Sequence, residues 1–375
     1  MKILLNCISS VSGGGRAYLR NISGPLAEAF RVHKKHALFF LAHRDQSELL
    51  RGVPASNVIW ISGLRPKGLR RVAWERSNLP RIVSDHRFEV LFTPYQVAPI
   101  VANVKNILMI RNMEPFLFGR YKYSTTTWIR NKILAAISAS CLRNANRVIA
   151  VSQFAADHLV CLDVPNEQIR TIYHGSPSLP KFNDDATDKL ATLGITGDFI
   201  LTCGSMLPYR RCEDVIRAFN SCMSALPAST CLVIAGSGAD VGYARLIRDI
   251  IALSPNPSRI LLLGNVPWET MVELYRRCML CAIATEIEAC PNIALEAMSA
   301  GCVIVSSNRP PLPEMFGGCV LGYEARDIDG LSRQIMRVVM DESLQRELSG
   351  RAILRAKDFS WSICVQNTYS ALTDW

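Results

Sequence analysis

The chain alternates short apolar segments with helical ones, and this alternation constrains its fold more than any other feature. The first half predicts strands at Lys2–Ile8, His36–Ala42, Val58–Ile61, Val90–Thr93, Asn106–Ile110, Arg147–Val151 and Ile169–Tyr173. Between them, segments such as Ala17–Phe30 and Thr127–Arg143 carry apolar residues at helical spacing. Strand–helix alternation of this kind predicts a parallel sheet that helices cover on both faces.

A polar segment with two prolines, residues 176–198, interrupts the pattern and is typical of a linker. The alternation then restarts and predicts strands at Phe199–Cys203, Thr230–Ala235, Ile260–Leu263, Leu280–Ala284 and Val303–Ser306, with helices at Cys212–Met223, Tyr243–Ser254, Met271–Arg277 and Ile293–Ala300. We therefore expect an α/β protein of two Rossmann-like doubly wound domains that face a cleft. Ligands of such sheets bind beyond the carboxyl ends of the strands.

The composition agrees with two well-filled cores and a cytoplasmic location. Of the 375 residues, 49% are hydrophobic and 20% are charged, which excludes a disordered chain. No apolar run reaches the roughly 18–20 residues that span a bilayer, and the N-terminal run is too short for a signal peptide. The 13 cysteines are scattered through apolar runs, as expected of buried thiols in a reducing compartment. Cys278 and Cys281 have zinc-ligand spacing but no second Cys/His pair, so we expect a structural role for them.

Positive charge is concentrated in the first half of the chain. Residues 1–180 carry 24 Lys and Arg against 10 Asp and Glu, a net charge of +14, whereas residues 181–375 carry 18 against 22, a net charge of −4. No groove-reading or base-stacking motif accompanies the cations, so we expect no nucleic-acid partner.

Two basic segments are candidates for contact with an anionic membrane. Residues 65–87 mix cations with apolar residues, namely Arg65, Lys67, Arg70 and Arg71 with Leu69, Trp74 and Leu79. Membrane or lipid-carrier contact and ordinary amphipathic packing are both open for this segment. For the helix at 127–143 we favour ordinary packing, because Ile129, Ile133 and Ile137 form one stripe.

Two motifs follow predicted strands and have groups that suit an anionic ligand. Gly13, Gly14 and Gly15 precede a helix, where bare backbone and a helix N-terminus favour an anion, although a plain tight turn explains them equally well. Arg210 and Arg211 lie just after the strand Phe199–Cys203, and guanidinium groups there suit a diphosphate. The alternative for these arginines is a pair of solvated surface cations.

The most informative motif is a pair of glutamates around a helix start. Glu288 ends the loop after the strand Leu280–Ala284, and Glu296 lies about one turn into the following helix. Pro291 and Asn292 suit the start of that helix, whose free N–H groups favour an anion. Glu296 stands among apolar residues and needs polar partners if it is buried, and ribose hydroxyls would supply them.

These residues and their order resemble family 4 of the retaining glycosyltransferases. After the Glu288-x7-Glu296 spacing, residues 297–306 read Ala-Met-x-x-Gly-Cys-Val-Ile-Val-Ser, as in that family. Residues 232–238, with Gly236, resemble its glycine turn near the nucleotide, and residues 263–266, ending at Val266, resemble its turn against the base. Pro313-Glu314 and Phe359-Ser360-Trp361 occur in the expected order. The resemblance covers nearly the whole chain, most densely from 199 to 320.

The resemblance implies the GT-B fold and a division of labour between domains. Residues 1–180 would be the acceptor-binding domain, 181–198 the linker and 199–355 the domain that binds a nucleotide sugar. The C-terminal helix at 356–375 would pack back on the N-terminal domain. The donor substrate would be a GDP- or UDP-linked sugar, with no cofactor and no metal ion.

Carried over by position, the family assigns roles to individual residues. Glu296 would hold the ribose hydroxyls and Glu288 the transferred sugar. Arg210, with Arg211 beside it, would bind the diphosphate. The backbone amides of Asn292 and Ile293 would meet the distal phosphate. Gly14 and Gly15 would let the N-terminal loop close over the donor.

Two positions depart from the family pattern. Ser205, in the phosphate loop, stands where arginine is frequent, and Arg111 or Asn112 stands where histidine is common near the reacting sugar. Arg111 does not deprotonate at working pH, so it cannot act as a base, although it can contact phosphate or acceptor. The departures leave open a non-catalytic partner subunit of a polysaccharide assembly complex, and a GT-B-fold nucleotide-sugar epimerase is the other alternative.

The sequence thus predicts a retaining, metal-independent glycosyltransferase of envelope or lipopolysaccharide biosynthesis. The sugar would be mannose or a related hexose, and the acceptor a lipid-linked oligosaccharide. The basic half would hold the protein peripherally on the inner face of the cytoplasmic membrane.

Overall fold

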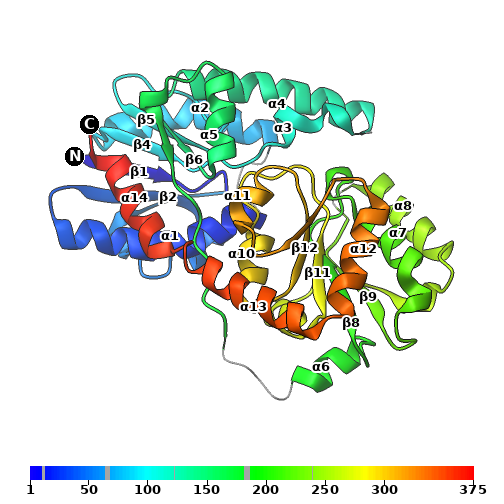
Figure 1. The fold of residues 1–375 in the computed structure, drawn as a ribbon. Helices are drawn as coiled ribbons and strands as arrows, with labels where there is room; N and C mark the ends of the chain where they lie inside the picture. The colour runs from blue at the N-terminus through cyan, green and yellow to red at the C-terminus, as the bar shows by residue number, and fades with distance from the viewer. Residues whose placement is uncertain (11–12, 64–67, 122, 181–185, 239) are drawn as a thin grey trace. The chain divides into compact units, whose positions relative to one another are not determined.

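The computed structural model describes residues 1–10, 13–63, 68–121, 123–180, 186–238 and 240–375, which form two compact units (Figure 1). The first unit comprises Met1–Leu117, Ser124–Gly175 and Ser360–Trp375, and the second comprises Phe118–Tyr123 and Ser176–Phe359. Each unit is a parallel sheet with helices packed on it, which confirms the predicted fold class.

In the first unit, the described residues form a seven-stranded parallel sheet in the order β3-β2-β1-β4-β5-β6-β7. The strands are β1 (Lys2–Asn6), β2 (Ala37–His43), β3 (Val58–Ile61), β4 (Val90–Thr93), β5 (Lys105–Ile110), β6 (Arg147–Ala150) and β7 (Ile169–Thr171). The helices are α1 (Gly13–His33), α2 (Gly68–Asp85), α3 (Glu114–Leu117), α4 (Thr125–Arg143), α5 (Gln153–Cys161) and the C-terminal α14 (Trp361–Thr373). The strand order reverses between β1 and β4, and this switch point is where a doubly wound sheet binds ligands.

The C-terminal helix α14 packs on α1, the first helix of the chain (Figure 1). The rings of Phe30 and Tyr369 lie 4.7 Å apart between the two helices. Gly175 makes room for the start of α14, because a Cβ at this position would lie 2.2 Å from the backbone nitrogen of Trp361. The last turn is fixed by Arg147, which donates to the carbonyl oxygen of Asp374 at 2.7 Å.

The second unit repeats the arrangement. In the part of it that the structure describes, six parallel strands run in the order β10-β9-β8-β11-β12-β13. They are β8 (Phe199–Cys203), β9 (Cys231–Ala235), β10 (Ile260–Gly264), β11 (Leu280–Ile283), β12 (Ile304–Ser307) and β13 (Leu321–Tyr323). The helices are α6 (Ala186–Thr192), α7 (Cys212–Cys222), α8 (Val241–Ala252), α9 (Trp268–Arg277), α10 (Asn292–Ser299), α11 (Leu312–Phe316), α12 (Ile328–Val339) and α13 (Glu342–Ala356). The switch point lies between β8 and β11.

The core of the second unit forms where the sheet meets α7 and α12. Ile200, Leu232 and Val305 come from the sheet and are fully or almost fully buried. Phe219 of α7 and Leu331 of α12 pack against them with no exposed surface. The apolar strand runs of the sequence are therefore buried on both faces, as expected of a parallel sheet.

The structure differs from the expected linker, and it bears on the two alternatives left open for residues 65–87. The predicted linker contains the helix α6, which packs near α9. In the candidate membrane segment at 65–87, Leu79 is fully buried and Trp74 packs on the core, as in ordinary amphipathic packing. Arg71 of this segment is buried and pairs with Glu75 at 2.6 Å, so it is no surface cation. Arg65 and Lys67 lie outside the described residues.

The expected packing of the helix at 127–143 is wrong for its first half. Ile129 and Ile133 of α4 are exposed to solvent rather than packed in the core. Among the described residues, no helix has both the length and the hydropathy needed to cross a bilayer.

Candidate functional site

Glycines allow the loops after β8, β9 and β10 to approach one another closely. Gly204 and Gly236 have φ angles of +125° and +139°, which glycine adopts readily and other residues rarely do. A Cβ at Gly236 would lie 1.9 Å from the carbonyl oxygen of Gly204, so only glycine fits. The amide of Gly236 donates to the carbonyl of Gly264 at 2.7 Å, and that of Gly204 to Ala235 at 2.9 Å. The three loops therefore form one backbone surface beside the switch point.

Arg210 and Glu288 meet at this surface. Arg210 ends a short 3-10 helix, Pro208–Arg210, after β8, and Glu288 lies in the loop between β11 and α10. The Nη1 atom of Arg210 donates to the Glu288 carboxylate, and the two side chains are only 20% and 10% exposed. A Cβ at Gly204 would lie 3.9 Å from the guanidinium, so bare backbone flanks Arg210.

The electrostatics of this pair favour an anion-binding role for Arg210. Burial lowers the pKa of Arg210, but the Glu288 carboxylate, Tyr209 and Cys203 together outweigh burial, and the net pKa shift is upward. Burial raises the pKa of Glu288, and Arg210 offsets only part of that rise. The Nε of Arg210 is buried and meets no hydrogen-bond acceptor within the described ranges. A permanently charged side chain thus keeps a donor that an incoming oxygen can use.

Glu296 lies one turn into α10, where its carboxylate accepts a hydrogen bond from Tyr275. The Tyr275 hydroxyl is 3.2 Å from Glu296 Oε2 and 3.2 Å from the thiol of Cys203 at the end of β8. Burial raises the pKa of Glu296, and the Tyr275 hydrogen bond offsets only part of the rise. The sequence did not indicate Tyr275 of α9 as a site residue, because an aromatic residue within an amphipathic helix is typical of the core.

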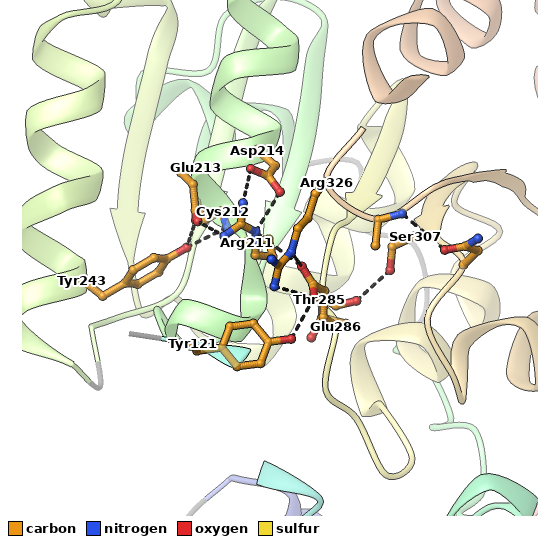
Figure 2. A network of polar contacts seen from close by, with 12 residues as sticks. Tyr121, Arg211, Cys212, Glu213, Asp214, Tyr243, Thr285, Glu286, Ser307 and Arg326 are labelled. Carbon is orange, nitrogen blue, oxygen red and sulfur yellow. Dashed lines mark hydrogen bonds and ion pairs between the residues drawn. The ribbon is translucent and has the colours of Figure 1, made fainter. Parts of the chain in front are cut away.

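Arg211 adopts the left-handed conformation, with φ of 53°, and its side chain turns to a different set of partners from that of Arg210. Its guanidinium forms two 2.8 Å hydrogen bonds with Asp214 and an ion pair of 2.8 Å with Glu213 (Figure 2). A third carboxylate, that of Glu286, lies 3.6 Å away. The predicted diphosphate contact of Arg211 stays a prediction, in which a ligand would compete with these carboxylates.

Glu286 is the centre of a network that holds the loop before Glu288 (Figure 2). Arg326 binds its two carboxylate oxygens at 2.7 and 3.1 Å, and the Tyr121 hydroxyl donates to it at 2.9 Å. Burial raises the pKa of Glu286, but the hydrogen bonds from Arg326 and Tyr121 outweigh it and the net shift is downward. Glu286, Arg326 and Tyr121 are brought together only by the fold, and no local sequence signal marks them.

In the first unit, Arg111 packs on the glycine turn at the start of α1. A Cβ at Gly15 would lie 2.4 Å from Arg111 Nη2, so the missing side chain of Gly15 accommodates the guanidinium. Arg111 Nη2 also lies 3.4 Å from the hydroxyl of Ser10, and its Cζ lies 5.5 Å from the ring of Tyr95. Burial lowers the pKa of Arg111 to about 10, so the guanidinium stays charged at neutral pH. Gly14 is in the same first turn of α1.

The remaining predicted residues lie on the same loops of the second unit. Ser205 is exposed, directly after Gly204. Val266 is half-buried two residues beyond Gly264, at the end of β10. Asn292 and Ile293 are the first residues of α10, whose leading N–H groups have no acceptor one turn earlier in the helix.

Comparison with known proteins identifies similar sequences over both units. A sequence model described as "Glycosyl transferases group 1" matches residues 190–355, and one described as "Glycosyltransferase Family 4" matches residues 12–176. The serotype-specific mannosyltransferase WbdA of Escherichia coli is 24% identical over 223 residues, 58% of this chain and 27% of that protein. The O-antigen chain mannosyltransferase B of Escherichia coli is 25% identical over 236 residues, 61% of each chain. The matched region is therefore less than two thirds of either relative.

Solved structures with the same fold align over nearly the full chain. HepE of Anabaena, crystallised with UDP and glucose, has a TM-score of 0.77 at 18% identity and covers 100% of both chains. The sucrose-phosphate synthase of Thermosynechococcus elongatus has a TM-score of 0.74 at 17% identity and covers 98% of this chain and 97% of its own. At such identities the likeness shows a common fold.

Proposed function

The chain belongs to glycosyltransferase family 4, and we propose that it is a retaining, metal-independent hexosyltransferase. In this proposal a sugar passes from a nucleotide-sugar donor to a lipid-linked or envelope polysaccharide acceptor. The observation that carries the proposal is the Arg210–Glu288 pair beside Glu296 and Tyr275, at the carboxyl ends of β8 and β11.

In the proposed reaction the main contribution of the protein is to stabilise charge. As the nucleoside diphosphate leaves, negative charge grows on a phosphate oxygen and positive charge on the sugar ring. Arg210, with a buried Nε that meets no acceptor within the described residues, is positioned to donate to that phosphate. The first amides of α10, at Asn292 and Ile293, would present the positive end of the helix dipole to the same phosphate. Fixed donors of this kind act without reorganisation, which is why they lower the barrier.

The two motif glutamates would contact different parts of the donor. Glu296 is a half-buried carboxylate that accepts a hydrogen bond from Tyr275, so it has lone pairs left for two ribose hydroxyls. Glu288 would face the transferred sugar, and its pairing with Arg210 would link sugar contact to phosphate contact. The loops of this site would also contact the phosphates and the base, and we propose such contacts for Ser205, Arg211, Gly236 and Val266.

The donor and acceptor are proposed from the named relatives and the charge distribution. Two of the relatives are called mannosyltransferases, which supports mannose or a related hexose as the sugar. HepE was crystallised with UDP, so both GDP- and UDP-linked donors are kept as candidates. The first half of the chain, with a net charge of +14, would serve the acceptor, and we propose a lipid-linked oligosaccharide at the cytoplasmic face of the membrane. Gly14, Gly15 and Arg111 belong to this half.

A thermal-shift screen with GDP, UDP, ADP and dTDP tests the donor site first. A nucleotide at 100 times its dissociation constant adds about 2.7 kcal/mol to the free energy of unfolding. The nucleotide that stabilises the chain then selects the sugar donors for a transfer assay, run with and without EDTA and read by NMR for the anomeric configuration. A retained configuration and full activity in EDTA are expected. Binding without transfer or donor hydrolysis would favour the non-catalytic partner, and release of an epimerised donor would favour the epimerase.

A further inference from the structure

The first half of α4 turns large apolar side chains to solvent. Trp128, Ile129 and Ile133 are 45%, 48% and 49% exposed. At about 100° per residue they fall within an arc of about 140° on one side of the helix. Asn131, which lies opposite Ile129 and Ile133 on the helix, is buried and donates to Glu114. It shares its side of α4 with the buried Ser138 and Leu142, so Ile129 and Ile133 face outward.

Helix α2 of the same unit has the ordinary arrangement. Its Leu79 and Val83 are buried in the core, and most of its exposed side chains, among them those of Arg70, Arg76 and Arg81, are polar. On α4, by contrast, Ile129 and Ile133 are about half exposed. Adjacent exposed side chains of this size on a soluble unit are typical of a surface that contacts a partner.

Positive charge surrounds the stripe. Arg130 and Lys132 are exposed on the same turns, and Lys132 Nζ lies 5.2 Å from the ring centroid of Trp128. The sequence has no acidic residue between Glu114 and Asp157. A face that is apolar and uniformly cationic is complementary to anionic lipid, because the rings and aliphatic groups enter the acyl boundary while the cations stay among the head groups.

We infer that Trp128, Ile129, Arg130, Lys132 and Ile133, together called the α4 surface, form a docking site for a bilayer that contains anionic phospholipid. This goes beyond the proposed function by naming the part of the molecule that holds it at the membrane. It rests on that function only in the assumption that the acceptor is carried by lipid. A nucleic acid would engage the cations but would leave the isoleucines in water.

Cosedimentation of the full chain with phosphatidylcholine vesicles, with and without phosphatidylglycerol, tests the inference. One variant carries Trp128→Ser, Ile129→Ser and Ile133→Ser, and a second carries Arg130→Gln and Lys132→Gln. The matched apolar control is Val241→Ser, Leu253→Ser and Met340→Ser, which removes exposed side chains of the second unit. The matched charge control is Lys34→Gln and Lys35→Gln, two exposed lysines at the end of α1.

The wild type and both controls should bind the anionic vesicles and bind the neutral ones far less. Each α4 variant should lower the vesicle partition coefficient by about tenfold or more, and added salt should weaken wild-type binding. Wild-type binding by either α4 variant, equal binding to both vesicle types, or no vesicle binding by the wild type would each overturn the inference. Dimerisation that depends on the α4 surface, without vesicle binding, would replace lipid with a second copy of the chain.

Two further measurements separate this inference from the proposed function. The melting temperature of each variant establishes that it folds, and the charge variant keeps the test valid if the apolar one does not. Nucleoside diphosphate binding should be unchanged in both α4 variants. If the wild type binds no nucleotide but docks as described, the proposed function fails and the α4 surface stands; if it binds nucleotide but never docks, the inference alone fails.

Discussion

The guanidinium of Arg210 and the carboxylate of Glu288 form an ion pair across 78 residues of sequence. Each group keeps the other in place and compensates its charge at a position with little solvent. An arriving diphosphate would take over part of the hydrogen bonding of Arg210, and the Glu288 carboxylate would then be free to turn to sugar hydroxyls.

Substitution of Arg210 should remove stabilisation of the departing phosphate. We expect Arg210→Ala to lower donor turnover by about 100-fold or more, the usual effect of losing one donor to a developing oxyanion, and to weaken nucleoside diphosphate binding. The measurements are initial rates and calorimetric titration. Arg276→Ala is the control, because Arg276 forms an ion pair of similar exposure with Glu273, at 3.2 Å on α9. Full activity in Arg210→Ala would remove this residue from the site.

Glu296→Gln should stabilise the ligand-free protein and weaken nucleotide binding. Burial raises the pKa of this carboxyl, so the folded state holds its proton more tightly than the unfolded state. The stability from this group is present below the unfolded pKa and is lost as the pH rises through the folded pKa. At neutral pH the variant should melt about 2–4 °C higher, the shift that about 1 kcal/mol produces in a domain of this size.

The same variant has a characteristic pH profile. As the pH falls towards the ordinary carboxyl value of 4.5, the wild type takes up the proton and the difference in melting temperature should shrink to zero. Unchanged nucleoside diphosphate affinity at neutral pH would contradict the proposed ribose contact. A difference in melting temperature that persists below pH 4.5 would contradict the stability argument.

Gly15→Ala should move Arg111 without unfolding the first unit. The new methyl group would lie 2.4 Å from Arg111 Nη2, which is the end of a flexible side chain and can give way. We expect the free energy of unfolding to change by about 1 kcal/mol or less and donor turnover to fall by about tenfold. Gly350→Ala, with no atom within 4 Å of its Cβ, is the control. In an Arg111→Ala background the effect of Gly15→Ala on turnover should vanish, and an undiminished effect would rule out coupling between the two residues.

The network around Glu286 should make its own contribution to stability. The net pKa of Glu286 is lowered, so its stabilisation is present above the unfolded pKa and is lost as the pH falls through the folded pKa. Glu286→Gln should therefore cost about 2 kcal/mol at neutral pH and progressively less below the ordinary value of 4.5. Tyr121→Phe should cost about 1 kcal/mol at all these pH values, because it removes one hydrogen bond. Chemical denaturation from pH 3 to 8 measures both, and a pH-independent loss in Glu286→Gln would be the contrary result.

Much of the fold could be predicted because strands of parallel sheets are short apolar runs between turn residues. Val58–Ile61 and Val90–Thr93 were predicted to the residue for this reason. β13 was missed, since Leu321–Tyr323 is three residues long and contains a glycine. α6 was missed because its sequence, Ala186–Thr192, lies in a polar segment without an apolar stripe.

The candidate site was predictable only where it follows directly from strand ends. Arg210 and Glu288 each follow a predicted strand, so their meeting at one sheet edge could be expected, although their ion pair could not. Tyr275 reads as a core aromatic. The contact of Tyr121 with Glu286 joins residues 165 positions apart and depends on tertiary structure alone. The exposure of the apolar stripe of α4 was not predicted, because helical periodicity shows that residues share one face of a helix but not whether that face points to the core or to solvent.

The segment Phe118–Tyr123 has a consequence for how this protein can be taken apart. The chain passes from one unit to the other after Leu117, Tyr123, Gly175 and Phe359. A fragment of residues 176–359 would lack Tyr121 and with it a ligand of Glu286, and a fragment of residues 1–175 would lack α14, which covers α1. No single cut in the chain therefore separates the two units intact.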